Sequence, residues 1–369
     1  MNQIELKNIT KHYQKNEPPA VAAINLSVNY GESVVLVGPS GSGKTTILKL
    51  IAGLSEASSG SLLLDGKDAC SRPPWDRGIG MVFQNGGLYP HMTVYQNISF
   101  GLERALSDKA RIAEEVQRTA ALLGISGLLA RKPGELSGGQ RQRVAIGRAI
   151  IRKPQILLMD EPLSNLEPGS RRQLRDELIA LRSRLGITCI YVTHDQTEAM
   201  TIGERVVVLN EGKIEQIGTP QNLYHKPDNV FVASFFGDPP MNYINSARLE
   251  NKNHRWRLSL LNKEINLPDN PFGKQPCDEP AALEVIVGIR PADICLCDPD
   301  LATAFLGELE EAQWLGADSI LQLKCGIDKL LLRVDGEQNL AKGSLVAFTV
   351  KPAELYLFHK KTRRRLCNG

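Results

Sequence analysis

Short runs of apolar residues, each ended by glycine or by polar residues, recur along the first two thirds of the chain. There are four of them: Ser33–Val37, Ile156–Met159, Ile187–Thr193 and Arg205–Leu209. Runs of this kind are typical of strands buried on both faces of a sheet. Between the second and third runs, Leu174, Leu178, Leu181 and Leu185 lie on one helical face, and Gly186 suits the end of that helix. Buried strands that alternate with a helix predict a mainly parallel α/β sheet.

The pattern changes after Pro239 and Pro240. No long segment with helical periodicity follows, and short candidate strands bounded by glycine, aspartate or proline take its place. They are Ala282–Ile289, Ser319–Cys325, Lys329–Val334 and Ser344–Val350. In the second of these strands, Leu321, Leu323 and Cys325 alternate with polar residues, as in a half-buried strand. The pattern predicts a small β-barrel or sandwich as a second domain.

Composition and charge narrow the classes of protein that fit this pattern. The 369 residues are 42% hydrophobic and 23% charged, which is typical of a globular chain with a sizeable core. Basic residues exceed acidic ones by only 44 − 41 = 3, too few for a chain that binds nucleic acid by charge alone. No apolar run approaches the ~18 residues of a membrane span, and the first residues do not resemble a signal segment. We therefore expect an intracellular protein that does not span a membrane.

A glycine-rich segment directly follows the first apolar run and opens a helix. It fits the pattern GxxxxGK[ST] and consists of Gly38, Pro39, Ser40, Gly41, Ser42, Gly43, Lys44 and Thr45, followed by Thr46. Glycines let successive backbone amides turn inward around an anion, and the helix adds the positive end of its dipole. In such a loop Lys44 lies against the β- and γ-phosphates, and the Thr45 hydroxyl is a ligand of Mg²⁺. The segment predicts a nucleoside triphosphate site, in a GTPase, a kinase, a helicase or a transport ATPase.

Two carboxylates follow the second apolar run. Four apolar residues place Asp160 at the carboxyl end of a buried strand, where α/β sheets bind ligands. A carboxylate there holds Mg²⁺ through water, and the next one, Glu161, points to the other side and polarises an attacking water. A pair of acidic residues that merely caps the next segment is the alternative.

A second glycine motif opens another helix. Ser137 is a good N-cap, and the glycines Gly138 and Gly139 expose amides at a positive helix terminus just before Gln140. This is physically another anion site, although it lies 137 − 44 = 93 positions beyond Lys44. An ordinary loop before a helix explains the glycines but not the whole octet LSGGQRQR.

Taken together, these motifs resemble the ATP-binding subunits of ABC transporters over residues 1 to about 236. The resemblance is carried by LSGGQRQR, the P-loop, ILLMDEP, Gln84 in MVFQ and His194 in VTHD. It implies that two identical subunits pair head to tail around two ATP molecules. Ser137, Gly139 and Gln140 of one subunit then complete the γ-phosphate site built on Lys44 of the other.

The same resemblance assigns roles to single residues. Tyr13 lies where the family stacks an aromatic ring on adenine, with a core tyrosine as the alternative. Gln84 matches the residue that senses the γ-phosphate and Mg²⁺ near the membrane partner. Glu161 matches the general base, and His194 matches the switch residue that contacts the γ-phosphate. The implied metal ligands are Thr45, Gln84 and Asp160.

Further segments resemble the maltose-type importer ATPases, within which the chain looks most like the ATPases of sn-glycerol-3-phosphate importers. These segments are Leu88–Val94, Val192–Met200, Phe235–Asn242, Gly288–Pro291, Leu315–Asp318 and Leu355–Phe358. The implied fold is an α/β P-loop ABC cassette over residues 1–236, with a helical subdomain at about 88–150. An all-β, oligonucleotide-binding-like regulatory domain over residues 237–369 is expected to follow.

The function expected from the resemblance is ATP hydrolysis that drives import of a carbohydrate or glycerol phosphate. The expected partners are a second copy of the chain, two transmembrane permease subunits, an extracytoplasmic solute-binding protein and a regulatory protein on the C-terminal domain, with no nucleic acid. The expected location is the cytoplasmic face of the inner membrane. An importer ATPase for an anion, iron or a polyamine is one alternative, and a soluble ABC ATPase acting on DNA or ribosomes is another.

Two positions depart from the family's pattern. Glu167 stands where the family has aspartate, and the added methylene is expected to loosen coupling between the two ATP sites. Gly86 and Gly87 replace bulkier residues after Gln84 and are expected to make that partner-facing loop more mobile.

Overall fold

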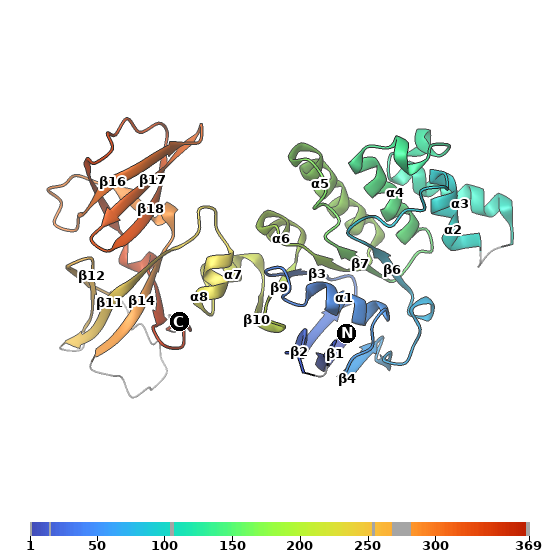
Figure 1. The fold of residues 1–369 in the computed structure, drawn as a ribbon, viewed down its shortest axis with the longest axis horizontal. Helices are drawn as coiled ribbons and strands as arrows, with labels where there is room; N and C mark the ends of the chain where they lie inside the picture. Colours follow the sequence, from blue (N-terminus) through green and yellow to red (C-terminus); the bar gives the residue numbers. More distant parts are fainter. Residues whose placement is uncertain (1, 15, 104–106, 253–254, 268–281, 367–369) are drawn as a thin grey trace. The chain divides into compact units, whose positions relative to one another are not determined.

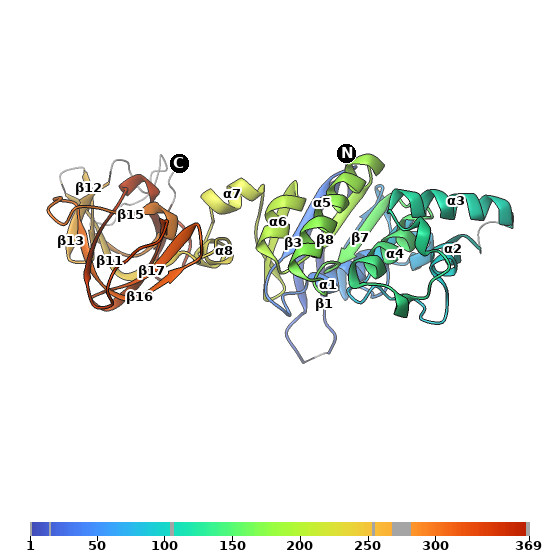
Figure 2. The ribbon, with the colours of Figure 1, turned by 90° about the horizontal axis from the view of Figure 1, so that it is seen from above.

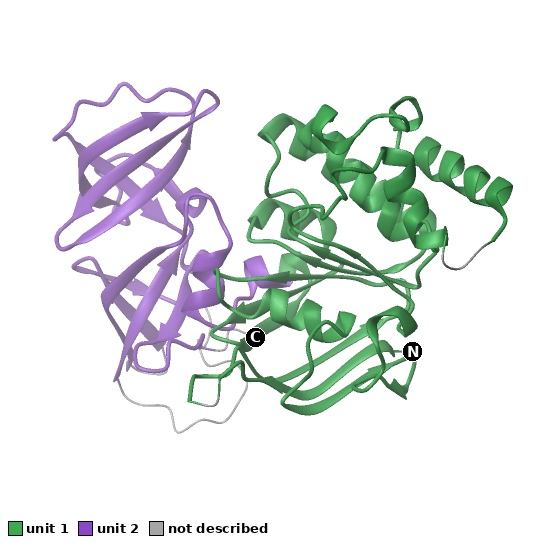
Figure 3. Cartoon of the chain, turned by 45° about the vertical axis from the view of Figure 1, so that its right-hand side comes forward, with its two compact units in different colours: residues 1–221 green, residues 222–369 purple. Residues whose placement is uncertain are grey.

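The chain folds into two compact units, residues 1–221 and residues 222–369, which Figure 3 shows in separate colours. The computed structural model describes the chain except for residues 1, 15, 104–106, 253–254, 268–281 and 367–369. Each unit has a hydrophobic core of its own.

The first unit is built on a six-stranded sheet in which five strands run parallel. Its order is β10-β9-β3-β8-β7-β6, and β10 pairs antiparallel with β9. The bounds are β3 (Ser33–Val37), β6 (Ile79–Val82), β7 (Ile156–Asp160), β8 (Thr188–Val192), β9 (Arg205–Asn210) and β10 (Lys213–Gly218). Every residue of β3, β7 and β8 is buried, which confirms the strands predicted from the apolar runs. Because these strands are parallel neighbours, the segments that follow them meet at one edge of the sheet.

An antiparallel sheet forms a second layer, and a helix lies between the two sheets (Figure 1). The strands of this layer have the order β2-β1-β4-β5. The bounds are β1 (Asn2–Lys11), β2 (Val21–Asn29), α1 (Lys44–Ala52), β4 (Ser59–Leu64) and β5 (Lys67–Asp68). Ile47 and Leu48 of α1 share one core with Leu6 of β1 and Leu158 of β7. The helix that follows the P-loop is therefore fixed by apolar contacts on two sides.

Three further helices gather at one end of this unit around a core of their own (Figure 2). They are α2 (Val94–Glu103), α3 (Lys109–Leu122) and α4 (Gly138–Ile150), accompanied by the 3₁₀ turns η1 (Pro74–Asp76), η2 (Ser126–Leu128) and η3 (Pro133–Glu135). Their core includes Ile98 of α2, Val116 of α3 and Val144 of α4. The helix that carries the second glycine motif is thus anchored by its apolar face.

The leucine spacing correctly predicts the helix between β7 and β8. The two helices on this side of the sheet are α5 (Pro168–Leu185) and α6 (Gln196–Ile202). Leu174, Leu178 and Leu181 are buried, and Leu185 at the helix end is 37% exposed. Gly186 is the C-cap of this helix and has φ of 62°, a left-handed conformation that glycine adopts without steric cost.

The second unit combines two five-stranded antiparallel sheets with short helical segments. The sheet orders are β13-β12-β11-β14-β20 and β15-β19-β16-β17-β18. The bounds are α7 (Pro220–His225), α8 (Val230–Phe235), β11 (Asn242–Lys252), β12 (Arg255–Leu260), β13 (Lys263–Asn266), β14 (Ala282–Ile289), η4 (Pro291–Asp293), β15 (Ile294–Leu296), β16 (Phe305–Trp314), β17 (Asp318–Cys325), β18 (Asp328–Asp335), β19 (Leu345–Val350), η5 (Pro352–Glu354) and β20 (Tyr356–His359). Leu258, Val287, Leu321 and Phe348 from both sheets enter one core. The predicted all-β C-terminal region is confirmed.

The division between the units precedes α8, whereas the domain boundary implied by the resemblance is at residue 236. The helix belongs with the second unit because Ala233 packs with Met241, Ile286 and Phe358. In addition, the Tyr243 hydroxyl donates to the Val230 carbonyl at 3.1 Å. Among the described residues, no helix is long and apolar enough to cross a bilayer.

Candidate phosphate and nucleotide site

The loop after β3 is shaped by glycines that accept no side chain. Gly38 has φ of 151° and Gly43 has φ of 99°. A Cβ at Gly38 would lie 2.1 Å from the Leu209 carbonyl oxygen, and one at Gly43 would lie 2.6 Å from that of Ala20. Both distances are shorter than a Cβ atom makes with a backbone oxygen, so only glycine fits. Gly41 between them also has positive φ, of 81°. The predicted P-loop therefore has the backbone geometry that turns amides around an anion.

Lys44 is held inside this loop. Its Nζ donates to the carbonyl oxygens of Gly38 and Pro39, each at 2.8 Å, and the residue is only 6% exposed. Burial lowers the pKa of Lys44, while the nearby carboxylates of Glu161 and Asp160 act to raise it. A cation whose hydrogen bonds all go to the carbonyls of its own loop is able to exchange them for phosphate oxygens.

The predicted magnesium ligands Thr45 and Asp160 lie together. The Thr45 hydroxyl donates to Asp160 Oδ1 at 2.9 Å. Burial raises the pKa of Asp160, which the hydrogen bond from Thr45 and the lysines Lys44 and Lys49 partly offset. A hydroxyl and a carboxylate beside a phosphate loop fit Mg²⁺, because this ion takes few protein oxygens and completes its shell with phosphate and water.

Glu161 is the meeting point of three segments that are far apart in the sequence. Gln84 Nε2 donates to Glu161 Oε2 at 3.1 Å, and His194 Nδ1 lies 3.3 Å from the same oxygen. Glu161 has φ of 44°, a left-handed conformation that is costly for a residue with a side chain. Its amide donates to the Val192 carbonyl at 3.0 Å, which ties this conformation to the end of β8. The predicted catalytic residues Glu161, His194 and Gln84 are thus brought together in one chain.

The remaining residues predicted near the nucleotide surround the start of α1. Tyr13 is 59% exposed, and its hydroxyl lies 3.3 Å from Thr46 Oγ1. Its exposure contradicts the alternative of a core tyrosine, and the ammonium of Lys11 lies 5.4 Å from the centroid of its ring. Pro39 and Ser40 form the exposed tip of the loop. Ser42 Oγ is buried and has no hydrogen-bond partner in the described part of the chain.

The second glycine motif is organised only by local contacts. Ser137 Oγ accepts from the Gln140 amide at 3.3 Å, and Gln140 Oε1 accepts from the Ser137 amide at 3.0 Å. This reciprocal pair is a capping box, which satisfies two of the free donors at the start of α4. Within the described residues, no hydrogen bond joins Ser137, Gly139 or Gln140 to the P-loop. The structure therefore does not bring the motif into the site of its own chain.

The sequence did not predict two groups that support the site. Asn165 Nδ2 donates to the Gln84 carbonyl at 3.4 Å and links the loop after Glu161 to the segment after β6. Glu198 is 3% exposed and accepts from Tyr191 at 2.9 Å and from Thr193 at 2.7 Å. Burial raises the pKa of Glu198. These bonds fix the segment that holds His194, but no local spacing reveals them because their partners lie on different elements.

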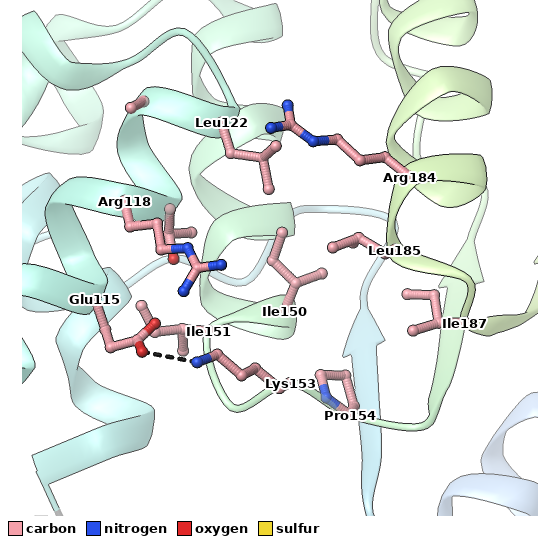
Figure 4. A pocket seen from close by; sticks show the side chains of 12 residues that line it. Glu115, Arg118, Leu122, Ile150, Ile151, Lys153, Pro154, Arg184, Leu185 and Ile187 are labelled. Carbon is pink, nitrogen blue, oxygen red and sulfur yellow. Dashed lines mark hydrogen bonds and ion pairs between the residues drawn. The ribbon is translucent and has the colours of Figure 1, made fainter.

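A hollow of about 680 Å³ between α3 and the end of α5 contains none of the predicted site residues (Figure 4). Arg118 and Arg184 lie on opposite sides of it, and Lys153 pairs with Glu115 at 2.7 Å. Its floor is apolar and includes Ile150. This hollow is therefore distinct from the phosphate loop.

Comparison with known proteins agrees with this geometry. The ABC transporter family profile matches residues 21–164. The chain is 41% identical over 365 residues to the uncharacterized ABC transporter ATP-binding protein YurJ of Bacillus subtilis strain 168, covering 98% of this chain and 99% of the relative. It is 43% identical to the sn-glycerol-3-phosphate import ATP-binding protein UgpC of Psychromonas ingrahamii, covering 99% and 96%. The UgpC protein of Escherichia coli O1:K1 / APEC is 42% identical, covering 98% and 99%.

Two solved structures resemble the first part of the chain. The cbiO1 protein of Clostridium perfringens, part of the ABC transporter complex cbiONQ, has a TM-score of 0.57 at 29% identity, covering 61% of this chain and 91% of that one. The ATP-binding cassette MJ0796, a dimer in a post-hydrolysis state with ADP and Pi, has a TM-score of 0.54 at 31% identity, covering 59% and 98%.

The fold and the phosphate loop define an ATPase of the P-loop class. With relatives above 40% identity over almost its whole length, the chain belongs to the family of ABC transporter ATP-binding proteins. The predicted family, fold class and ATPase activity are thereby confirmed. The roles of the individual site residues stay predictions.

Proposed function

We propose that this chain is the ATP-hydrolysing subunit of an importer for sn-glycerol 3-phosphate. The observation that carries the proposal is the convergence of Gln84, Glu161 and His194 beside a complete P-loop. Relatives of matching length that are named as sn-glycerol-3-phosphate import proteins support the choice of solute. The alternatives of an anion, iron or polyamine importer, or of an ATPase acting on DNA or ribosomes, have no observation in their favour.

The site residues divide the hydrolysis of ATP among them. Lys44 moves from its loop carbonyls to the β- and γ-phosphates, and the amides of the loop surround the same oxygens. Thr45, Asp160 and Gln84 would hold Mg²⁺, which would neutralise phosphate charge. Glu161 accepts the proton of a water whose oxygen attacks the γ-phosphorus, while the bond from that phosphorus to the β–γ bridging oxygen breaks and ADP leaves. His194 and Gln84 orient Glu161 and the γ-phosphate.

A second copy of the chain is proposed to complete each site. The amides at Ser137 and Gly139 open a helix whose positive end suits the γ-phosphate, yet they make only local bonds in the chain itself. Variants that each add one cysteine, Ser40→Cys and Ser137→Cys, test the arrangement after Cys295→Ser has removed an exposed native thiol. Mixing the two should give an ATP-dependent disulfide, whereas each variant alone should give none. A disulfide within the Ser137→Cys sample alone contradicts head-to-tail pairing.

The permease is proposed to dock beside Gln84. A hollow of about 670 Å³ there is lined by aromatic residues, of which Trp75 is 75% and Phe83 is 40% exposed. Basic side chains outnumber acidic ones in its wall: Arg72, Arg77, Arg148, Arg152 and Lys153 against Asp65 and Asp76. These features fit a permease segment with one apolar face and carboxylates at its edge. The chain would then lie on the cytoplasmic face of the membrane, served by an extracytoplasmic solute-binding protein and by a regulatory protein on the second unit.

Transport in vesicles tests the proposal. The chain is reconstituted with the permease and solute-binding proteins encoded beside it, and uptake of labelled sn-glycerol 3-phosphate is compared with uptake of maltose, inorganic phosphate, ferric iron and spermidine. Uptake should need ATP and should be greatest for sn-glycerol 3-phosphate. ATP-driven uptake of another solute in its place contradicts the substrate, and ATP hydrolysis without any uptake contradicts the importer.

A further inference from the structure

The segment after β6 that carries Gln84 is a tight turn closed by a glycine. The Gly86 amide donates to the Phe83 carbonyl at 2.8 Å, so Gln84 is one of the two central residues of the turn. Gly86 and Gly87 both have positive φ, of 67° and 59°. Residues with a side chain adopt this conformation only at a cost that glycine does not have. The turn therefore needs these glycines for its shape, and something must hold them in it.

Arg148, in the last turn of α4, makes the contacts that hold them. Its Nη1 donates to the Gly87 carbonyl at 2.6 Å, and its Nη2 donates to the Gly86 carbonyl at 2.9 Å. The guanidinium lies 5.6 Å from the ring centroid of Tyr89. Burial lowers the pKa of Arg148, and among the described residues no carboxylate forms a salt bridge with it. This half-buried guanidinium therefore uses its two terminal nitrogens to bind two neighbouring backbone carbonyls.

The rest of the same helix face also lies against the turn. A Cβ at Gly86 would be 3.6 Å from Ala145 Cβ and 4.0 Å from Gln142 Oε1. Ala145 and Arg148 are three residues apart and so share one face of α4. The helix begins at the Ser137 capping box, which is 11 residues before Arg148 and so about 16 Å away along the helix axis. One rigid element thus joins the second glycine motif at one end to the Gln84 turn at the other.

From these contacts we infer that Arg148 is a positioning residue for Gln84. It fixes the two carbonyls that follow the turn, and so sets where the Gln84 amide meets Glu161. When α4 moves, the guanidinium pulls on the turn, because both of its hydrogen bonds end on backbone carbonyls, which cannot rotate away as side chains can. The inference rests on the proposed role of Gln84 in hydrolysis and deepens it.

Steady-state ATP hydrolysis and nucleotide binding by the purified chain, without permease, test this role. Arg148→Ala should lower kcat by about 10- to 100-fold, as expected for a misplaced catalytic group, while ATP affinity stays as in the wild type. Arg148→Lys should fall between the two because lysine is a point donor and cannot grip both carbonyls. Arg118→Ala is the matched control: this exposed arginine on α3 lines the other hollow, which contains none of the site residues, so its kcat should be unchanged.

A double-mutant cycle with Gln84→Ala separates positioning from simple stabilisation. If Arg148 acts through Gln84, adding Arg148→Ala to Gln84→Ala lowers kcat no further. The inference is overturned if the losses of kcat in the two single variants multiply in the double variant. It is also overturned if Arg148→Ala keeps the wild-type kcat, or if that variant loses ATP affinity and melting temperature together with kcat. Gln84→Ala with a full rate instead refutes the proposed role of Gln84, and missing uptake in vesicles refutes the importer while leaving Arg148 unaffected.

Discussion

Each unit buries a cation, and the two cations differ in how firmly their side chains are held. In the first unit Lys44 lies in a glycine loop and bonds two carbonyls of that loop. In the second unit Arg290 is 3% exposed, donates to the carbonyls of Phe236, at 2.7 Å, and Tyr224, and stacks 3.6 Å from the Tyr224 ring centroid. The lysine is a flexible point charge that can change partners, whereas the arginine is a planar fork held by two carbonyls and by the face of an aromatic ring.

Backbone strain shows the same contrast. In the second unit Leu261 and Asn262 have φ of 47° and 64°, and they form the two-residue turn between β12 and β13, where positive φ is what a hairpin requires. In the first unit Glu161 has φ of 44° directly after a buried parallel strand, where no turn type asks for it. Positive φ at Leu261 and Asn262 therefore shapes a hairpin, whereas at Glu161 it presents a chemical group at the sheet edge.

Glu161→Gln should have the largest effect on the first unit. The amide keeps the size of the side chain but cannot accept a proton, so hydrolysis should fall by about 10²- to 10⁴-fold, the usual contribution of a general base. ATP should still bind, and a closed dimer should accumulate. Phosphate release and size-exclusion chromatography with ATP measure the two effects. Turnover at the wild-type rate would remove Glu161 from the mechanism.

Lys44→Ala tests whether the buried lysine contributes to ATP binding rather than to the stability of the fold. Loss of a charge-assisted phosphate contact worth ~3 kcal/mol should weaken ATP binding by about 100-fold. Stability should change by less than ~0.5 kcal/mol, because the loss of two hydrogen bonds is offset by no longer burying a charge. Titration with a fluorescent ATP analogue and a denaturant melt report these quantities. Unchanged affinity would contradict the P-loop assignment, and a large loss of stability would erase the contrast with Arg290.

Arg290→Ala should give the opposite result in the second unit. Two buried carbonyls lose their donor and the Tyr224 ring loses its stacking partner, so this unit should be destabilised by about 2 kcal/mol. ATP binding by the first unit should not change. The matched control is Lys360→Ala, which breaks an exposed pair with Glu284 at 3.0 Å and should cost ~0.5 kcal/mol or less. If the two variants unfold at the same denaturant concentration, the buried arginine is not architectural.

Sequence patterns predict those features whose causes are local. The P-loop, the strand before it, the helix after it and the helix that contains Leu174 and Leu185 follow from residue spacing within a short stretch of chain. The meeting of Gln84, Glu161 and His194 depends on strand order, which spacing alone does not fix, and it was expected only from family resemblance. The hydrogen bonds from Arg148 to the Gly86 and Gly87 carbonyls were not predicted. A long side chain that reaches a backbone carbonyl far away in the sequence leaves no periodic signal. That these glycines loosen the loop stays a prediction, and their carbonyls accept the two hydrogen bonds from Arg148.

Glu167 offers the smallest test, at a position where this chain departs from its family. Glu167 is the N-cap of α5, immediately before Pro168, and its side chain makes no capping hydrogen bond. Aspartate is among the best N-caps because its shorter carboxylate reaches the amides of the first turn. Glu167→Asp should therefore stabilise the first unit by about 0.5–1 kcal/mol, read as a higher denaturant midpoint with unchanged slope. Glu167→Gln, which keeps the length and removes the charge, should give no gain. If the glutamine variant gains as much stability as the aspartate variant, charge repulsion at Glu167 rather than a missing N-cap hydrogen bond limits the stability of this helix.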